Sequence, residues 1–275
     1  MDQTPARERS PTMTQHLPTA ECLIAVDVGN SGIKVGIYAR DGEPGLPEPL
    51  AVQELSSREP DLGSLWPWLP PRPCNWFVSS VFRRADQQLR DAIGRVRPRD
   101  DCRLLTWRDF PLEIDLPRPD LVGADRLAGA VGANLLRSPD RSALIVDAGS
   151  AITVDAVSPA GVLLGGAILP GMHLAARVLS EETDLLPWVD PDDEQTLPHP
   201  LGRSTRDAIR SGIYWGACGA VRELLARIGG LLPGEPQIFV SGGANRAFVP
   251  VLVGATFVPH LVLGGIVIAA RHVAA

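Results

Sequence analysis

The chain has 275 residues, 45% of them hydrophobic, which is enough for two domains that each bury a core. Its formal net charge of −6 argues against general nucleic-acid binding, because proteins of that class carry a basic surface. The four cysteines lie far apart in no disulfide or zinc pattern, so a cytoplasmic location is expected. No apolar stretch is long enough to span a membrane, and the polar residues 1–20 are expected to form a disordered tail.

The first half of the chain predicts three strands followed by alternating helix and strand. Leu89, Ile93 and Val96 are spaced for one face of a helix over residues 83–96. The proline-containing segment 110–122 has no periodicity and is predicted to be an irregular linker. Apolar, β-prone runs predict strands near Leu104 and at residues 23–27, 33–39, 50–54 and 75–81.

The second half repeats this order after an alanine-rich helix at residues 123–137. The remaining helices are predicted at 172–180, 204–229 and from Leu261, and the strands at 144–147, 152–157, 162–168, 237–241 and Thr256. This order predicts α/β domains with mixed sheets, at residues 21–121 and 122–275. It resembles the duplicated ribonuclease-H-like core of the actin, hexokinase and Hsp70 superfamily, which implies a cleft between the domains.

A short hairpin motif occurs twice. Residues 23–30 read LIAVDVGN and residues 143–150 read ALIVDAGS, so Asp27 corresponds to Asp147. In the first copy Gly29 allows a tight turn whose backbone N–H groups can bind an anion. Lys34 lies two residues after Gly32 and four after Asn30, so these residues alternate onto the same side of the strand, and Lys34 is expected to return to the same edge of the hairpin. Asp27 would then hold Mg²⁺. An ordinary hairpin with a polar turn is the alternative.

The second copy offers a carboxylate and hydroxyls, in Asp147, Ser150 and Thr153, that suit a cation and phosphate oxygens. Asp155 fits a site and an exposed surface about equally well. VSGGAN at 240–245 follows a predicted strand and suits either close approach to a nucleotide or a simple turn. The chain contains no GxxxxGK[ST] motif, which excludes a P-loop, and its five histidines show no ligand spacing.

GADR at residues 123–126 opens a helix after the linker. By default Asp125 is a carboxylate in the first turn and Arg126 a surface cation. In a phosphoryl-transfer site, such an Asp could instead accept a hydroxyl proton, and such an Arg could bind a substrate carboxylate with two hydrogen bonds. Sequence spacing leaves both interpretations open.

Together these motifs resemble the type III pantothenate kinase family. The matches run in order along residues 23–268 and comprise DVGNSGIK at 27–34, SSV at 79–81, GADR at 123–126, DAGSAITVD at 147–155, GGAILPG at 165–171, GRSTRDAIRSGIYWG at 202–216 and SGGAN at 241–245. The resemblance implies ATP-dependent phosphorylation of pantothenate to 4′-phosphopantothenate, in coenzyme A biosynthesis. It also implies a homodimer whose pantothenate pocket is completed at the subunit interface.

The resemblance also implies roles for individual residues. Asp125 is the expected proton acceptor, and Asp147 the expected ligand of a monovalent cation, K⁺ or NH₄⁺. ATP and its Mg²⁺ are expected at Asp27, Val28, Gly29, Asn30, Ser31, Gly32, Ile33, Lys34 and Ser150. Pantothenate is expected at Gly123, Ala124, Asp125, Arg126 and Thr205.

Three positions depart from the family pattern. Ser150 replaces the usual Thr and keeps the hydroxyl, Leu116 stands where the family often has a substrate-contacting Tyr, and Phe82 replaces a Pro after SSV. Two other functions are weighed against the kinase: a non-catalytic regulatory or binding protein on the same scaffold, and another superfamily member such as a sugar kinase or a polyphosphate phosphatase. The intact Asp27, Lys34 and Asp125, with the ordered motifs, favour the kinase.

Overall fold

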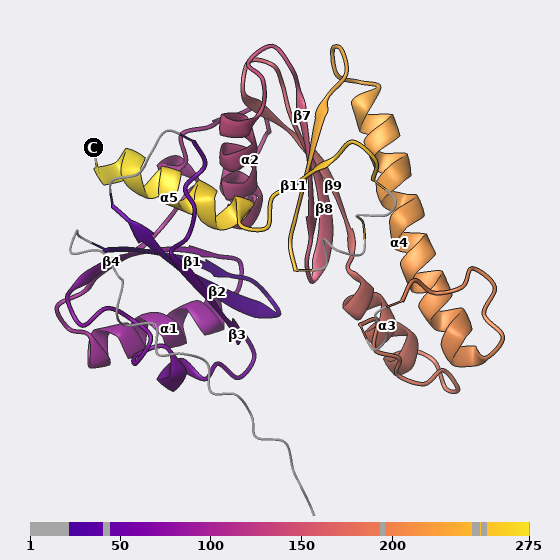
Figure 1. Cartoon of the computed structure of the whole chain (residues 1–275), viewed down its shortest axis with the longest axis horizontal. Helices are drawn as coiled ribbons and strands as arrows, with labels where there is room; N and C mark the ends of the chain where they lie inside the picture. Colours follow the sequence, from indigo (N-terminus) through magenta and orange to yellow (C-terminus); the bar gives the residue numbers. More distant parts are fainter. Residues whose placement is uncertain (1–21, 41–44, 193–195, 244–247, 249–251, 275) are drawn as a thin grey trace, which may run out of the picture.

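The computed structural model describes residues 22–40, 45–192, 196–243, 248 and 252–274 (Figure 1). The predicted tail, residues 1–20, lies outside these ranges, as do Ala244 and Asn245 of the SGGAN motif. Two mixed sheets with helices make up the described fold, which confirms the predicted fold class. Within the described ranges, no helix has the length and apolar character needed to cross a membrane.

The first sheet has the strand order β3-β2-β1-β4-β5. β1 pairs antiparallel with β2 and parallel with β4. β2 in turn pairs antiparallel with β3, and β4 pairs parallel with β5. β1 is buried on both faces along nearly its whole length, which explains why its sequence is a continuous apolar run. The strands are β1 (Cys22–Val28), β2 (Gly32–Ala39), β3 (Ala51–Ser56), β4 (Cys74–Ser80) and β5 (Asp101–Leu104).

The second sheet repeats this arrangement, with the order β11-β10-β7-β8-β9-β6. β7 takes the place of β1, because it pairs antiparallel with β8 and parallel with β10. The duplication predicted from the two hairpins therefore extends to the whole sheet, with β6 added at one edge. The strands are β6 (Glu113–Ile114), β7 (Ala143–Ala148), β8 (Ala151–Val157), β9 (Val162–Pro170), β10 (Gln237–Ser241) and β11 (Thr256–Phe257).

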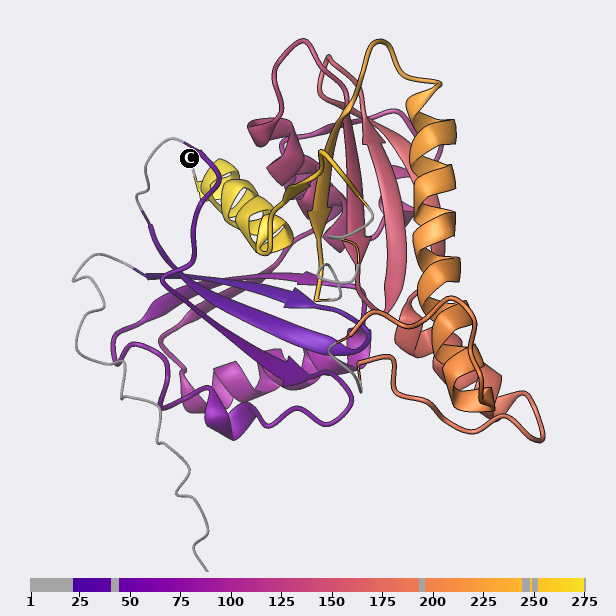
Figure 2. The same cartoon turned by 45° about the vertical axis from the view of Figure 1, so that its right-hand side comes forward.

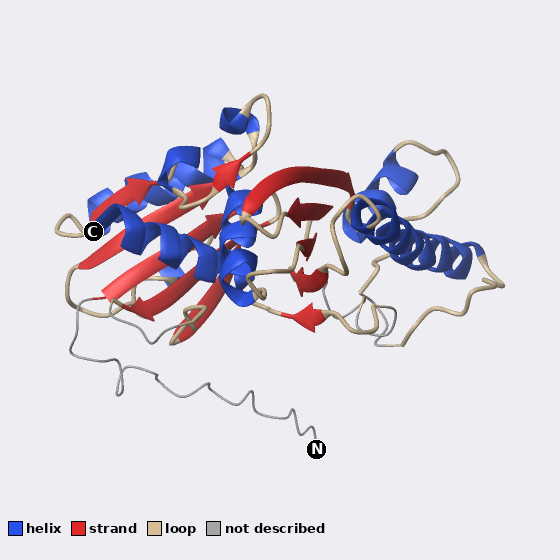
Figure 3. Ribbon diagram, turned by 90° about the horizontal axis from the view of Figure 1, so that it is seen from above, coloured by secondary structure: helices blue, strands red, loops and turns tan. Residues whose placement is uncertain are grey.

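Helices lie between the two sheets and on their outer sides. Figure 1 shows α2 and α5 between the sheets and α1 outside the first sheet, and in Figure 3 α4 lies on the side of the second sheet that faces away from the first. The α-helices are α1 (Arg83–Val96), α2 (Ala124–Leu136), α3 (Met172–Glu181), α4 (Thr205–Gly229) and α5 (Leu261–Ala274). Short 3-10 helices are η2 (Leu62–Ser64), η3 (Trp107–Asp109) and η4 (Pro119–Leu121).

The last helix, α5, covers the first sheet. It contacts β1, β2 and β4, and Figure 2 shows it lying across that sheet. It also packs tightly on α2: a Cβ at Gly265 would lie 1.9 Å from the Ala128 carbonyl oxygen, and one at Gly132 would lie 2.8 Å from the Leu261 oxygen. The glycines therefore let the two helix backbones approach closely. The hydrophobic core on this face of the first sheet is thus completed by α5, a helix far from β1 in the sequence.

The expected irregular linker contains a strand that the sequence did not indicate. Glu113 and Ile114 form β6 and pair in parallel with Val162 and Leu163 of β9. Two residues between prolines give no alternation, so only the partner strand reveals this pairing. The second sheet thus takes a strand from before residue 122, and the domain division at that position stays a prediction.

Candidate functional site

The two motif aspartates end equivalent strands. Asp27 lies on β1 in register with Lys34 on β2 and Ser79 on β4, and Asp147 lies on β7 in register with Thr153 on β8. Asp27 alternates with Leu23 and Ala25, which belong to the core around α2 and α5. Asp147 likewise alternates with Ala143 and Ile145 of that same core. Both carboxylates therefore sit on the inner faces of their sheets.

The two hairpin turns meet. In the first turn Gly29 donates its N–H to the Gly32 carbonyl at 2.9 Å, and in the second Gly149 donates to the Ala151 carbonyl at 3.0 Å. The Ser150 hydroxyl donates to the Ser31 hydroxyl at 2.6 Å. Residues 119 positions apart are thus joined directly, which brings the turns of the two motifs together.

Lys34 returns to Asp27, as its parity predicts. Its ammonium lies 3.8 Å from Glu54 of β3, and its side chain is 26% exposed, which leaves the charge reachable by a ligand. The first turn is one residue longer than the second, so Lys34 occupies the position that Thr153 holds in the second sheet. The only positively charged side chain in the two hairpin motifs, that of Lys34, therefore belongs to the first hairpin.

The GADR segment, at the N-terminus of α2, brings Asp125 near the carboxylates of Asp27 and Asp147. Gly123 is the N-cap residue of α2, and Asp125 Oδ1 accepts the backbone N–H of Arg126 at 2.8 Å. A Cβ at Gly123 would lie 2.4 Å from Asp125 Oδ1 and 3.5 Å from Val81 of the SSV motif. Val81 in turn donates its N–H to the Val28 carbonyl at the end of β1. Glycine at position 123 thus leaves the space that the carboxylate occupies.

Arg126 and Asp155 form a buried ion pair. The side chains are 15% and 3% exposed, and Arg126 Nε lies 3.0 and 3.1 Å from the two carboxylate oxygens, while Nη2 also donates to Oδ1. This resolves both interpretations that the sequence left open: Arg126 is not a surface cation, and Asp155 is not a surface carboxylate.

The carboxylates of the site repel one another. Burial raises the pKa of Asp27 to about 8, the charges of Asp125 and Asp147 add to the effect, and Lys34 opposes it. Burial, with the charge of Asp125, raises the pKa of Asp147 to about 6. Burial also raises the pKa of Asp125. Asp27 Oδ1 is fully enclosed and has no hydrogen-bond partner among the described residues. An enclosed, unpartnered carboxylate oxygen among like charges fits a cation.

Three further residues lie beside these carboxylates: Ser79, to which sequence reasoning gave no role of its own, and Ser241 and Gly242, for which it left open close approach to a nucleotide or a simple turn. Ser79 pairs with Asp27 and Ser241 with Asp147, so each sheet places a buried serine beside its aspartate. Gly242 has a φ of +93°, and a Cβ there would lie 2.5 Å from Asp147 Oδ1. The signal that could have revealed them is the matching position of SSV and SGG, each of which ends the strand beside an aspartate.

Thr205 lies apart from the other expected substrate residues. It begins α4 behind its N-cap Ser204, and none of the described contacts joins it to Asp125 or Arg126. It lines an apolar cavity of about 730 Å³ between α3 and α4. The other lining residues are Leu169, Pro170, Met172, Ala175, Val178, Leu179, Leu186, Ala208, Ile209, Gly212, Ile213, Gly216 and Ala217.

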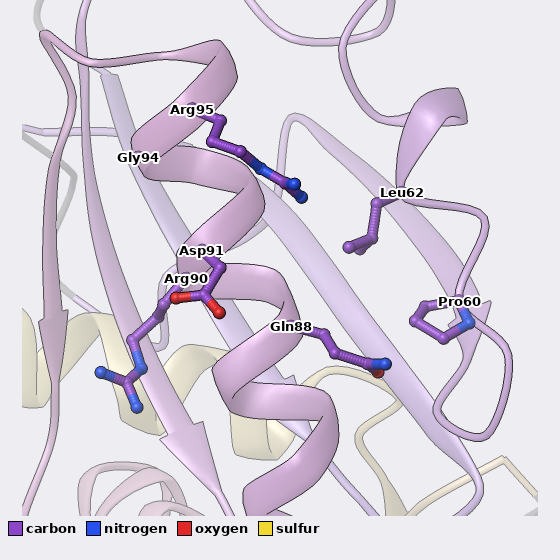
Figure 4. Close-up of a pocket in the computed structure, with 7 residues that line it drawn as sticks. All are labelled: Pro60, Leu62, Gln88, Arg90, Asp91, Gly94 and Arg95. Atoms are coloured by element: carbon purple, nitrogen blue, oxygen red, sulfur yellow. The ribbon is translucent and has the colours of Figure 1, made fainter.

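A second cavity, of about 680 Å³, lies on the outer side of α1 and belongs to neither hairpin (Figure 4). Figure 4 shows the side chains of Gln88 and Arg95 reaching from α1 toward Pro60 and Leu62. Since α1 covers the face of the first sheet opposite to Asp27, this cavity is separate from the carboxylates.

Comparison with known proteins places the chain in a family. The family model described as "Type III pantothenate kinase" matches residues 23–227. A type III pantothenate kinase from Chlorobaculum parvum is 32% identical over 253 residues, covering 88% of this chain and 92% of that protein. One from Legionella pneumophila strain Paris is 34% identical over 257 residues, covering 90% and 98%.

Solved structures share the fold at lower identity. A conserved Baf family protein from Campylobacter jejuni is 18% identical, with a TM-score of 0.55 over 90% of this chain and 97% of its own. An activator of the 2-hydroxyisocaproyl-CoA dehydratase from Clostridium difficile, solved with bound ADPNP, is 16% identical, with a TM-score of 0.50 over 90% and 94%. At these identities the likeness concerns the fold.

Proposed function

The chain belongs to the type III pantothenate kinase family and phosphorylates pantothenate in coenzyme A biosynthesis, and from this premise we propose how its residues divide the reaction. The observation that carries the proposal is the convergence of Asp27, Asp125 and Asp147 where the two hairpins meet. Phosphoryl transfer depends mainly on alignment and on neutralising charge, which this arrangement of carboxylates, Lys34 and backbone turns can provide.

The nucleotide side comprises both hairpins. Residues Asp27–Lys34 and Ser150 would bind the ATP phosphates, with the Gly29 turn contributing backbone N–H groups and Lys34 a positive charge. Asp27 would hold Mg²⁺, and Asp147 a monovalent cation, K⁺ or NH₄⁺. The enclosed Oδ1 of Asp27 and the raised pKa values of both carboxylates support these assignments. Bound cations would offset the repulsion among the carboxylates and the negative phosphates.

The pantothenate side comprises the N-terminus of α2. Asp125 would accept the proton of the substrate hydroxyl, and its raised pKa makes it a better base near neutral pH than an exposed carboxylate. Arg126 would bind the pantothenate carboxylate, and Gly123 and Ala124 would line its approach. Leu116 packs beside Gly165 of β9 and supplies no hydroxyl in place of the family tyrosine.

The test of the proton acceptor is Asp125→Asn, which keeps the shape and removes the base. We expect kcat to fall by about 10²- to 10⁴-fold while ATP binding, measured by calorimetry, is retained. An unchanged kcat would exclude Asp125 as the base. Replacing K⁺ by Na⁺ in the same assay should lower activity in the wild type, and the effect should be lost in Asp147→Asn.

Thr205 supports a homodimer whose subunits share the pantothenate pocket. Its position in the apolar cavity between α3 and α4, away from Asp125, is expected if it completes the pocket of a second subunit. Asp125→Asn and Thr205→Val subunits, each impaired alone, should then regain activity when mixed and allowed to exchange, because one pocket per heterodimer is intact. Recovery would be absent if Thr205 served its own subunit. The free cysteines are consistent with a cytoplasmic enzyme.

A further inference from the structure

We propose that Asp155 is the positioning residue that holds Arg126 ready for the substrate carboxylate. The inference rests on the proposed function, in which Arg126 binds pantothenate. Asp155 is 2% exposed, lies in the middle of β8 and makes its ion pair with an arginine 29 residues earlier in the chain. A buried carboxylate with a single cationic partner restricts that partner to one orientation.

The geometry of the pair leaves one edge of the guanidinium available. A guanidinium presents two edges that can bind a carboxylate with paired hydrogen bonds: Nε with Nη2, and Nη1 with Nη2. Asp155 occupies the first edge. No hydrogen bond or ion pair among the described residues uses Arg126 Nη1. The second edge therefore stays free for a carboxylate from outside the chain.

The surroundings of Asp155 are built to hold it. A Cβ at Gly166 on the neighbouring strand would lie 2.6 Å from Asp155 Oδ1 and 2.2 Å from the Val154 carbonyl oxygen, so only glycine leaves space for the carboxylate. Thr153, two residues away on the same strand face, donates a hydrogen bond to Asp155. The other carboxylate that acts on Arg126 is Asp125, the proposed base. Asp155 thus also keeps Arg126 from pairing with Asp125.

The test is the kinetics of Asp155→Asn with two substrates. Pantothenate carries the carboxylate, and panthenol, its alcohol analogue, lacks it but keeps the hydroxyl that is phosphorylated. We expect KM for pantothenate to rise about 10- to 100-fold, which corresponds to the loss of charged hydrogen bonds. KM for panthenol and KM for ATP should stay within about twofold of the wild type. A merely structural role would instead change all three together.

The matched control is Asp86→Asn. Asp86 makes an equivalent two-bond pair with Arg90, at 2.8 Å for each bond, and its side chain is 6% exposed, but it lies on α1 outside the first sheet. Its loss should leave all three KM values unchanged. If Asp155→Asn does not fold, Thr153→Val replaces it, with an expected rise of about 2- to 10-fold in KM for pantothenate alone.

Arg126→Ala separates this inference from the proposed function. If Arg126 binds the carboxylate, Arg126→Ala raises KM for pantothenate but not for panthenol, and adding Asp155→Asn has no further effect. If Arg126→Ala behaves so while Asp155→Asn leaves KM for pantothenate unchanged or lower, the positioning role of Asp155 is refuted. If Arg126→Ala affects neither substrate selectively, the assigned role of Arg126 fails, and the inference fails with it.

Discussion

Replacing Asp27 by asparagine should stabilise the cation-free protein, although it should abolish efficient catalysis. The carboxylate is enclosed, lacks a hydrogen-bond partner among the described residues at Oδ1, and lies near the charges of Asp125 and Asp147. Its pKa is therefore raised from 3.8 to about 8. The asparagine side chain would keep the shape of the protonated acid and carry no charge at any pH.

The sign and size of the effect follow from proton linkage. The folded protein retains a proton on Asp27 that the unfolded chain releases above about pH 4, so the stability of the wild type falls as pH rises through this window and levels off above pH 8. One pKa unit corresponds to about 1.4 kcal/mol, so the advantage of Asp27→Asn should be near zero at pH 4 and about 4 kcal/mol at pH 7.

Urea unfolding in EDTA at pH 5, 7 and 8.5, followed by circular dichroism, measures this difference. Asp184→Asn, the same substitution at an exposed position, controls for the general loss of a carboxylate. Adding Mg²⁺ should stabilise the wild type more than the variant, because the cation binds the ionised carboxylate. The reasoning is refuted if Asp27→Asn is less stable than the wild type at pH 8.5, or if the difference between them is the same at every pH.

Four further substitutions test the fold and the pocket. Gly265→Ala should lower stability by about 2–4 kcal/mol in thermal unfolding, since its Cβ would overlap the Ala128 oxygen, whereas Gly94→Ala, with open space in α1, should raise it by about 1 kcal/mol. Asp100→Ala should cost about 3 kcal/mol, because its buried carboxylate accepts hydrogen bonds from Cys74, Trp76 and Arg97; equal stability would contradict this. Leu116→Tyr should lower KM for pantothenate several-fold in steady-state assays, and an unchanged KM would show that the missing hydroxyl is not needed.

Most of the fold could be predicted because the apolar runs are local signals. The hairpin of Asp27 and Lys34 follows from parity alone, and helix α1 from the spacing of Leu89 and Ile93. β6 could not be predicted, because a strand of two residues depends on its partner β9 rather than on its own pattern.

The candidate site was predictable where a motif carries its own chemistry and less so where partners are distant. Asp27 and Asp147 could be paired from the repeat, but the burial of Asp155 depends on Arg126, 29 residues away, and no local signal contains that contact. Likewise the sequence could not separate Thr205 from the other pantothenate residues, because only the placement of α4 does so.

The position of α5 also determines when the protein can fold during synthesis. The helix that covers the inner face of the first sheet is made after the strands of both sheets, and Arg271 near its end donates to the carbonyls of Arg40 and Ala39 at 3.1 and 3.3 Å. On the ribosome, the strands of residues 22–80 therefore emerge early and wait with one apolar face uncovered until the final turn of α5 is released. The N-terminal half completes its core only after α5 has been translated, so a stop codon before Leu261 would destabilise a sheet encoded far upstream of it.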